Sequence, residues 1–306
     1  MADLSGMNIL VTGGTGSFGQ AFCARALAVG ANVTVYSRDE FKQSQMAAEC
    51  GSDRLRFVVG DIRDLARLTC ACDGMDVVVH AAAMKQVPAC EDNPGEAIDS
   101  NVGGSRNVIA AANATGVRVV VGISTDKAAY PTSAYGATKL LAERLFAASA
   151  ASPTRFCVVR LGNIFGSRGS VVPLFVRQAA DGEVLTVTDR SMTRYSIMPD
   201  DAADLVLTAI EVARGEEIFV PKMPSYRVGD VADALAGPGG VRETGARAGE
   251  QTHECLITEA EAERCTDMGP YWVITRGSGD NTVLAAYSNT NDEWMTAEDI
   301  RMAAGV

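Results

Sequence analysis

Residues 7–29 read MNILVTGGTGSFGQAFCARALAV, and this stretch decides the fold. A short apolar run over 7–12 meets glycines, and apolar residues then recur at helical spacing over 17–29. Gly13, Gly16 and Gly19 stand three apart at the junction. Glycine permits the tight turn, lets the backbone approach a pyrophosphate and lets the helix pack on the sheet. The stretch predicts a strand, a phosphate-binding turn and a helix; an ordinary strand-to-helix turn is the alternative.

The same alternation continues along the chain. Further strands are predicted over 32–36, 54–59, 75–81, 117–124 and 156–161, with helices over 65–71, 94–115 and 133–149. Beyond residue 166 the pattern is less regular, with helices expected over 171–181, 200–212, 227–236 and 257–265, extended pieces over 184–187 and 217–220, and a connecting stretch over 237–249. Strands separated by helices predict an α/β fold, a Rossmann-type doubly wound parallel sheet with a smaller C-terminal lobe. We expect a dinucleotide-binding domain over 1–165 and a substrate-binding lobe over 166–306, interleaved with the first.

Composition excludes several classes of protein. The chain has 306 residues, of which 47% are hydrophobic and 21% charged, as in globular proteins. Its net charge of −11 argues against a nucleic-acid partner. No apolar stretch long enough to span a membrane occurs, and no basic segment precedes the first apolar run, so we expect a cytoplasmic protein. Eight cysteines without a CxxC pair, and only two histidines, indicate neither a disulfide framework nor a metal site.

The end of the second strand bears on the cofactor. Ser37, Arg38 and Lys42 offer hydroxyl and cationic donors suited to the 2′-phosphate of NADP, whereas Asp39 keeps NAD possible. A solvated charged loop is the alternative. Asp61 and Ile62, after the third strand, resemble the adenine-contacting corner of such folds. The full set of expected cofactor contacts is Gly13, Thr15, Gly16, Ser17, Phe18, Gly19, Ser37, Arg38, Asp39, Lys42, Asp61, Ile62, Ala81, Ala82, Ala83, Lys85, Tyr135 and Lys139.

Tyr135 and Lys139 stand four apart in a predicted helix, so their side chains share one face. A nearby ammonium group lowers the pKa of a phenol, which makes Tyr135 a candidate base for a substrate hydroxyl. Ser124 and Thr125 precede the pair and could orient a reacting oxygen. A solvent-facing helical pair is the alternative for this common spacing.

Thr125, Asp126 and Lys127 end a predicted strand, where open α/β sheets bind their ligands. A carboxyl and an amine at this position would face the substrate. Hydride transfer alone does not need them, so a neighbouring acid and base would add elimination to the chemistry.

Nine strings bring these motifs together with a known family. In order between residues 12 and 294 they are TGGTGSFG, YSRDEFKQSQM, HAAAMKQVPACEDNP, STDKAAYPTSAYGATK, RLGNIFGSRGSVVPLF, DRSMTRYSI, EIFVPKMPS, GARAGEQTHECLI and YSNTNDEW. The chain thereby resembles the inverting UDP-N-acetylglucosamine 4,6-dehydratases, extended short-chain dehydrogenase/reductases of amino-sugar biosynthesis. The resemblance covers nearly the whole chain.

The resemblance implies a mechanism on matching positions. Tyr135 with Lys139 would assist removal of a hydride from sugar carbon 4 to a tightly bound, recycled NADP. Lys127 resembles the base that takes the carbon-5 proton, and Asp126 the acid that protonates the departing carbon-6 hydroxyl. The hydride returns at carbon 6, and reprotonation from the opposite face inverts carbon 5.

The resemblance also implies the binding residues and the assembly. The expected contacts to the UDP-sugar are Lys85, Asn163, Arg168, Ser170, Val171, Thr193, Arg194, Arg247 and Glu250. We interpret His253 as structural, and we expect a homo-oligomer. Two positions depart from the family pattern: Gln86 stands where histidine is usual, and Tyr130 where asparagine is usual.

Two other functions fit part of these features. A C5- or C4-epimerase of a UDP-sugar would use the same cofactor and much of the same site. A catalytically silent Rossmann protein that senses NADP would keep the fold without turnover; the set Tyr135, Lys139, Asp126 and Lys127 argues against it.

Overall fold

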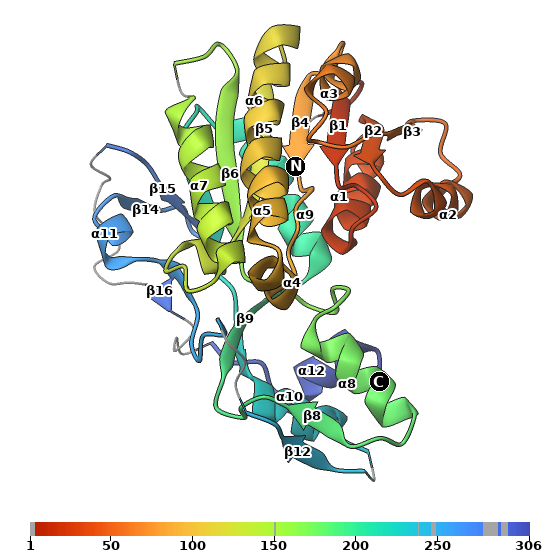
Figure 1. Ribbon diagram of the computed structural model, residues 1–306, viewed down its shortest axis with the longest axis vertical. Coiled ribbons are helices and arrows are strands. Elements are labelled where there is room, and N and C mark those ends of the chain that lie inside the picture. The colour runs from red at the N-terminus through yellow and green to blue at the C-terminus, as the bar shows by residue number, and fades with distance from the viewer. Residues whose placement is uncertain (1–3, 150, 238, 246–248, 278–286, 289–292) are drawn as a thin grey trace.

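The computed structural model describes residues 4–149, 151–237, 239–245, 249–277, 287–288 and 293–306. A nine-stranded sheet organises the larger part, in the order β14-β15-β10-β6-β5-β4-β1-β2-β3 (Figure 1). Its strands are β1 (Asn8–Thr12), β2 (Asn32–Ser37), β3 (Leu55–Val59), β4 (Val77–His80), β5 (Val119–Thr125), β6 (Arg155–Leu161), β10 (Ile218–Pro221), β14 (Cys265–Asp267) and β15 (Tyr271–Ile274). All pair in parallel except β15, which is antiparallel to both β10 and β14. The predicted Rossmann-type sheet is confirmed.

Helices cover both faces of this sheet because its parallel strands are joined by crossover helices and the strand order reverses at β1. On one face α1 (Ser17–Ala28) packs against α9 (Pro199–Val212); on the other α3 (Leu65–Cys72), α6 (Gly104–Thr115) and α7 (Ala134–Ala148) lie side by side (Figure 1). The remaining helical segments of this part are α2 (Glu40–Cys50), α4 (Val87–Asp92), α5 (Pro94–Ala97), the π-helical turn Ile98–Gly103, the 3-10 turn Asp126–Ala128 and α11 (Glu259–Ala262). The predicted helix 94–115 is thus α5, the π turn and α6 in succession.

A second hydrophobic core lies below the sheet in Figure 1, between α8 (Val171–Ala180), α10 (Val228–Leu235) and α12 (Ala297–Ala304). Three short strands contribute to this core: β8 (Leu185–Val187), β11 (Ser225–Arg227) and β12 (Val241–Glu243). The other short strands pack against the core of the large sheet: β7 (Asn163–Ile164), β9 (Thr193–Ile197), β13 (Cys255–Ile257) and β16 (Tyr287–Ser288). The chain after residue 166 therefore feeds both cores, since β10, β14 and β15 belong to the large sheet. The division at residue 165 stays a prediction.

One helix prediction is wrong. Residues 257–265 form β13, the single turn of α11 and β14 rather than one helix. Thr258 and Glu261 form a capping box that begins a helix, but the helix does not continue because Cys265 pairs with Ile274 at the edge of the sheet. The stretch 237–249, expected as a connection, contains β12, which pairs with β8.

Candidate active site

The glycine turn forms one wall of a cavity of about 580 Å³. Gly13 has φ +70, and a Cβ there would lie 2.7 Å from the backbone nitrogen of Ala82, so only glycine fits. Gly16 is the N-cap of α1 and has no side chain to cover the helix N-terminus. All eighteen expected cofactor contacts line this cavity, from Gly13 to Lys139. The hydroxyl of Ser124, which also lines it, is buried and has no hydrogen-bond partner in the described structure. The cavity thus fits an extended ligand with phosphate and polar groups.

The end of β2 presents cations to this cavity. The Asp39 carboxylate caps α2 by accepting from the Lys42 backbone nitrogen at 3.0 Å, and it also accepts from Lys42 Nζ at 2.5 Å. Both oxygens of the Asp39 carboxylate therefore already accept hydrogen bonds from Lys42. Arg38 is 69% exposed, and its guanidinium lies 3.8 Å from Asp61. The most accessible charged donor at the strand end is an arginine.

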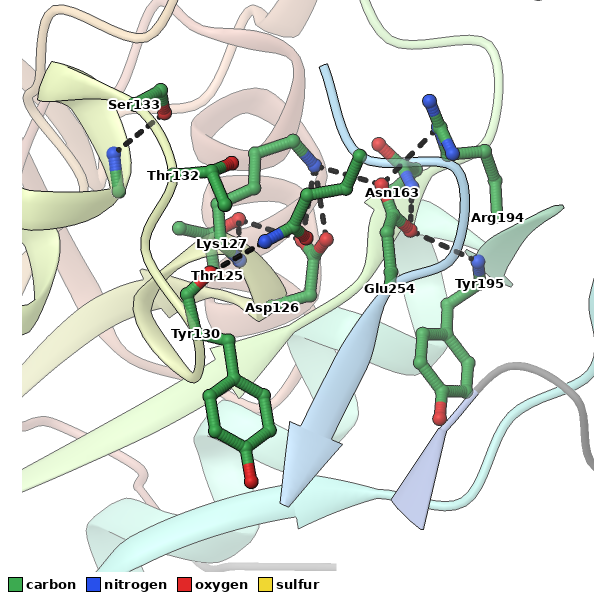
Figure 2. A network of polar contacts seen from close by, with 12 residues as sticks. Thr125, Asp126, Lys127, Tyr130, Thr132, Ser133, Asn163, Arg194, Tyr195 and Glu254 are labelled. Carbon is green, nitrogen blue, oxygen red and sulfur yellow. Dashed lines mark hydrogen bonds and ion pairs between the residues drawn. The ribbon is translucent and has the colours of Figure 1, made fainter. Parts of the chain in front are cut away.

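Thr125, Asp126 and Lys127 leave β5 in a single 3-10 turn, with Thr125 as its cap. Lys127 Nζ lies 3.0 Å from Asp126 Oδ2 and 3.0 Å from Glu254 Oε1 (Figure 2). Helix α7 approaches this turn closely, and Gly136 permits the approach because a Cβ at that position would collide with the Lys127 carbonyl oxygen. The sequence YGATK therefore brings Tyr135 to the same place as Lys127.

Glu254 completes this cluster from a distant segment. Its side chain is 2% exposed, and it accepts from Asn163 Nδ2 at 2.8 Å and from the Tyr195 backbone nitrogen at 3.3 Å. Arg194 Nε lies 3.3 Å from its other oxygen. A second cavity of about 220 Å³ adjoins the first. Lys127 and Asn163 line both cavities, whereas Arg194 and Glu254 line only the second.

The pKa values of the two carboxyl groups in this cluster shift in opposite directions. Burial raises the pKa of Glu254, and the neighbouring Asp126 charge raises it further. Burial would also raise the pKa of Asp126, but Lys127 and a hydrogen bond from Thr125 outweigh it and lower that pKa. Burial would lower the pKa of Lys127, yet the two carboxylates outweigh it and raise that pKa above its usual value. Lys127 is thus an ammonium group in this state, and its conversion to a base requires a proton acceptor.

The Tyr135 and Lys139 pair differs from its sequence-based expectation. Burial raises the pKa of Tyr135 to about 12, and the cation that opposes this rise is Lys127 rather than Lys139. Burial also lowers the pKa of Lys139 to about 8, while Glu143, one turn further along α7, opposes the fall. Lys139 Nζ donates to the Ile123 carbonyl oxygen at 2.6 Å. The expected lowering of the phenol pKa by Lys139 is therefore absent here, because desolvation dominates.

Six of the nine expected sugar contacts line one or both of the cavities. Lys85 and Asn163 line both cavities, Arg168 and Ser170 line the first, and Arg194 and Glu250 line the second. Val171 and Thr193 do not belong to the described lining of either cavity: Val171 begins α8, and the Thr193 hydroxyl bonds to His253 Nδ1 at 2.7 Å. Arg247 lies outside the described residues.

Arg168 also contacts the glycine turn. Its guanidinium donates to the Thr15 carbonyl oxygen, and its backbone nitrogen donates to Ser17 Oγ at 3.0 Å. The loop after β7 therefore closes over the first cavity.

The two departures from the family pattern differ in placement. Gln86 lines both cavities. Tyr130 is 49% exposed, and its carbonyl oxygen accepts from Gln251 Nε2 at 2.5 Å. Sequence reasoning missed Glu254, although it stands inside the string GARAGEQTHECLI. In that string only Arg247, Glu250 and His253 carried an interpretation, because nothing local joins Glu254 to Lys127.

Fold and site together define a Rossmann-type nucleotide-binding enzyme. Lys127, paired with two buried carboxylates, lines the same cavity as the half-buried Tyr135 and the buried Lys139. The family model described as "Polysaccharide biosynthesis protein" matches residues 9–276, and the chain belongs to this family.

Two curated relatives have different activities. The chain is 43% identical over 278 residues to UDP-N-acetylglucosamine 4,6-dehydratase (inverting) of Campylobacter jejuni, covering 89% of this chain and 83% of the relative. It is 41% identical over 319 aligned positions to UDP-glucose 4-epimerase of Rickettsia bellii, covering 96% and 94%. The resemblance to the inverting dehydratases is confirmed.

Solved structures agree on the fold. Pen from Bacillus thuringiensis superposes with a TM-score of 0.93 at 35% identity, covering 98% of this chain and 97% of that one. DesIV, a dTDP-glucose 4,6-dehydratase from Streptomyces venezuelae solved with NAD and TYD bound, gives a TM-score of 0.74 at 27% identity, covering 80% and 87%. Among the described residues, no helix is both long and apolar enough to cross a membrane.

Proposed function

We propose that this protein dehydrates a UDP-hexosamine, UDP-N-acetylglucosamine before others, to a 4-keto-6-deoxy sugar with inversion at carbon 5. The observation that carries the proposal is the Asp126–Lys127 ion pair at the end of β5, whose lysine lines the same cavity as Tyr135. An epimerase at carbon 4 needs no acid for a departing hydroxyl. The identity to an inverting dehydratase supports the same reaction.

Each side chain has a part in this reaction. Tyr135, with Lys139 beneath it, takes the proton of the carbon-4 hydroxyl. Lys127 takes the carbon-5 proton, and Asp126 protonates the carbon-6 hydroxyl as it leaves. Lys85, Asn163, Arg168, Ser170, Arg194 and Glu250 bind the UDP-sugar in the two adjoining cavities; Val171, Thr193 and Arg247 stay predicted contacts.

A nicotinamide dinucleotide fits the first cavity and, when bound, accepts the sugar hydride and returns it. The NAD bound to DesIV supports this class of cofactor. We propose NADP because the Arg38 guanidinium is largely exposed and lies 3.8 Å from Asp61, whereas the Asp39 carboxylate is engaged by Lys42 at 2.5 Å. Replacing Arg38 by Ala should lower the preference for NADP over NAD about tenfold or more, measured as the ratio of dissociation constants. An unchanged ratio would contradict the assignment.

The deciding experiment incubates the purified protein with UDP-N-acetylglucosamine and no added cofactor. Product NMR reads carbon 5 and carbon 6, and mass spectrometry reads the loss of one water. A product of unchanged mass with an altered centre would instead establish the C4- or C5-epimerase, which the identity to UDP-glucose 4-epimerase supports. No conversion of any UDP-hexosamine would favour the silent NADP-sensing protein. Homo-oligomer and cytoplasmic location stay predictions.

A further inference from the structure

We propose that Glu254 is a positioning residue, which holds the Lys127 side-chain nitrogen and the Asn163 amide at the place where the two cavities meet. The proposal rests on the proposed dehydration, in which Lys127 is the base and Asn163 is a contact of the sugar. Both of these side chains line both cavities, whereas Glu254 lines only the second. Glu254 thus acts on the substrate through its neighbours.

The Glu254 carboxylate has donors on both of its oxygens. Lys127 Nζ lies 3.0 Å from Oε1, and Arg194 Nε lies 3.3 Å from the same oxygen. Asn163 Nδ2 donates to Oε2 at 2.8 Å, and the Tyr195 backbone nitrogen donates to it at 3.3 Å. An ionised carboxyl group has about four acceptor sites, so these donors account for them. The carboxylate is therefore occupied by protein groups rather than open to a substrate hydroxyl.

The donors come from separate parts of the chain, as Figure 2 shows. Lys127 lies in the turn after β5, Asn163 begins β7, and Arg194 and Tyr195 belong to β9. Glu254 directly precedes β13 and stands 127 positions after Lys127. One buried carboxylate, 2% exposed, therefore joins these segments at the edge of the cavities.

Lys127 needs a partner outside its own turn to be fixed in the site. Its four-carbon stem is flexible. Asp126 Oδ2 lies 3.0 Å from Lys127 Nζ, but Asp126 belongs to the same turn and cannot relate that turn to the rest of the site. Glu254 can, because Arg160 anchors its segment by donating to the Leu256 carbonyl oxygen at 2.7 Å. The Lys127 nitrogen is thus fixed between its own turn and the segment that leads into β13.

The position of this nitrogen matters for the reaction. A base has to lie within hydrogen-bonding reach of the proton that it removes. A displacement of about 1 Å can slow a reaction on the order of 100-fold. A lysine held by two carboxylates at the edge of the cavities is in place before the substrate binds.

Two variants separate position from charge. Glu254→Gln keeps the length of the side chain, but it has one acceptor oxygen and sets an NH₂ group against one pair of donors. Glu254→Asp keeps the charge but draws the carboxylate back by one carbon–carbon bond. In both variants we expect incorporation of deuterium at carbon 5 of the UDP-N-acetylglucosamine product from D₂O to fall about 10–100-fold. Reduced dinucleotide should still form, seen by its absorbance, because oxidation at carbon 4 depends on Tyr135 and Lys139.

The dissociation constant of the dinucleotide should be unchanged in both variants, because Glu254 is not among the described residues that line the first cavity. The matched control is Glu217→Gln. Glu217 is also a buried glutamate, and it accepts from the Arg214 and Gly215 backbone nitrogens at 2.7 Å each, but it lines neither cavity. This control should exchange at carbon 5 at the wild-type rate.

Exchange at the wild-type rate in Glu254→Gln would overturn the positioning role. The same result in Glu254→Asp would overturn it too, since charge alone would then suffice, and this variant decides the question if Glu254→Gln does not fold. Loss of dinucleotide binding in both variants would also overturn it, because Glu254 would then only support the fold. If the wild type itself releases no water from UDP-N-acetylglucosamine, the proposed function fails and the positioning role fails with it.

Discussion

Two buried clusters in this protein share one pattern, a cation between two carboxylates, and differ in the cation. In the first, Arg160 lies 2.7 Å from Glu143 and 2.8 Å from Glu261, and its side chain is 0% exposed. In the second, Lys127 lies between Asp126 and Glu254 at the edge of both cavities. A guanidinium keeps its proton under all conditions that a protein meets, whereas an ammonium can give it up. A cation between two carboxylates therefore stabilises the packing of the chain where the cation is arginine, and permits proton transfer where it is lysine.

The two clusters are joined through one short segment. Glu254 and Glu261 flank β13, and Arg160 also donates to the Leu256 carbonyl oxygen at 2.7 Å. Glu143 stands on α7, two turns after Tyr135. The arginine cluster thus fixes the segment that carries Glu254 against the helix that carries Tyr135.

The largest expected effect, on turnover, comes from replacing Lys127 by arginine, which makes its cluster like that of Arg160. Lys127→Arg keeps the positive charge between the two carboxylates but removes the group that can become a base. Turnover of the UDP-sugar should fall about 10²–10⁴-fold, as with Lys127→Ala, while the dinucleotide stays bound. Turnover of Lys127→Arg near the wild-type rate would contradict the claim that lysine is needed here because it can give up its proton.

Removing the cation of the first cluster should act on stability. Arg160→Met leaves two buried carboxylates without a partner, which should lower the free energy of unfolding by about 3–5 kcal/mol in urea titrations. The matched control is Arg276→Met, which removes a half-exposed arginine from Glu216 and should change that free energy by less than about 0.5 kcal/mol. Equal losses of unfolding free energy in Arg160→Met and Arg276→Met would show that burial does not make the first ion pair more important for stability than the second.

Acid should weaken the arginine cluster over a defined range. Burial would raise the pKa of Glu261, but Arg160 outweighs it and lowers that pKa to about 2. Because the folded value lies below the unfolded value, this stability is present above about pH 4.5 and is lost as the pH falls toward about 2, a total of about 3 kcal/mol. Melting temperatures across this range should fall less steeply in Glu261→Gln; parallel curves would contradict the assignment.

The smallest expected effect concerns the cap that holds Glu261. Thr258 Oγ1 accepts from the Glu261 backbone nitrogen at 3.2 Å and donates to Glu261 Oε2 at 3.1 Å. Thr258→Ala should lower the free energy of unfolding by about 1 kcal/mol, and Thr258→Ser should restore most of it. A loss as large as that of Arg160→Met would mean that the cap, rather than the ion pair, positions Glu261.

Much of the large sheet could be predicted because its signals are local. Apolar runs of strand length and helical spacing lie within short windows, as in β1 with α1. The six strands predicted between residues 7 and 161 all lie in one parallel sheet. The helix predicted over 257–265 was wrong because pairing of Cys265 across the sheet edge overrode helical spacing. The contact of β10 with β6 likewise joins segments separated by more than fifty residues.

The sequence by itself determined the glycine turn, the shared helical face of Tyr135 and Lys139, and the adjacency of Asp126 and Lys127, because each depends on residues at most a few positions apart. Only the tertiary structure decided which groups control the charge of Lys127. Glu254 stands 127 positions away, and the pairing depends on how β13 packs beside the turn after β5. Burial then sets the pKa values, and burial is a property of the packed chain that no local pattern contains.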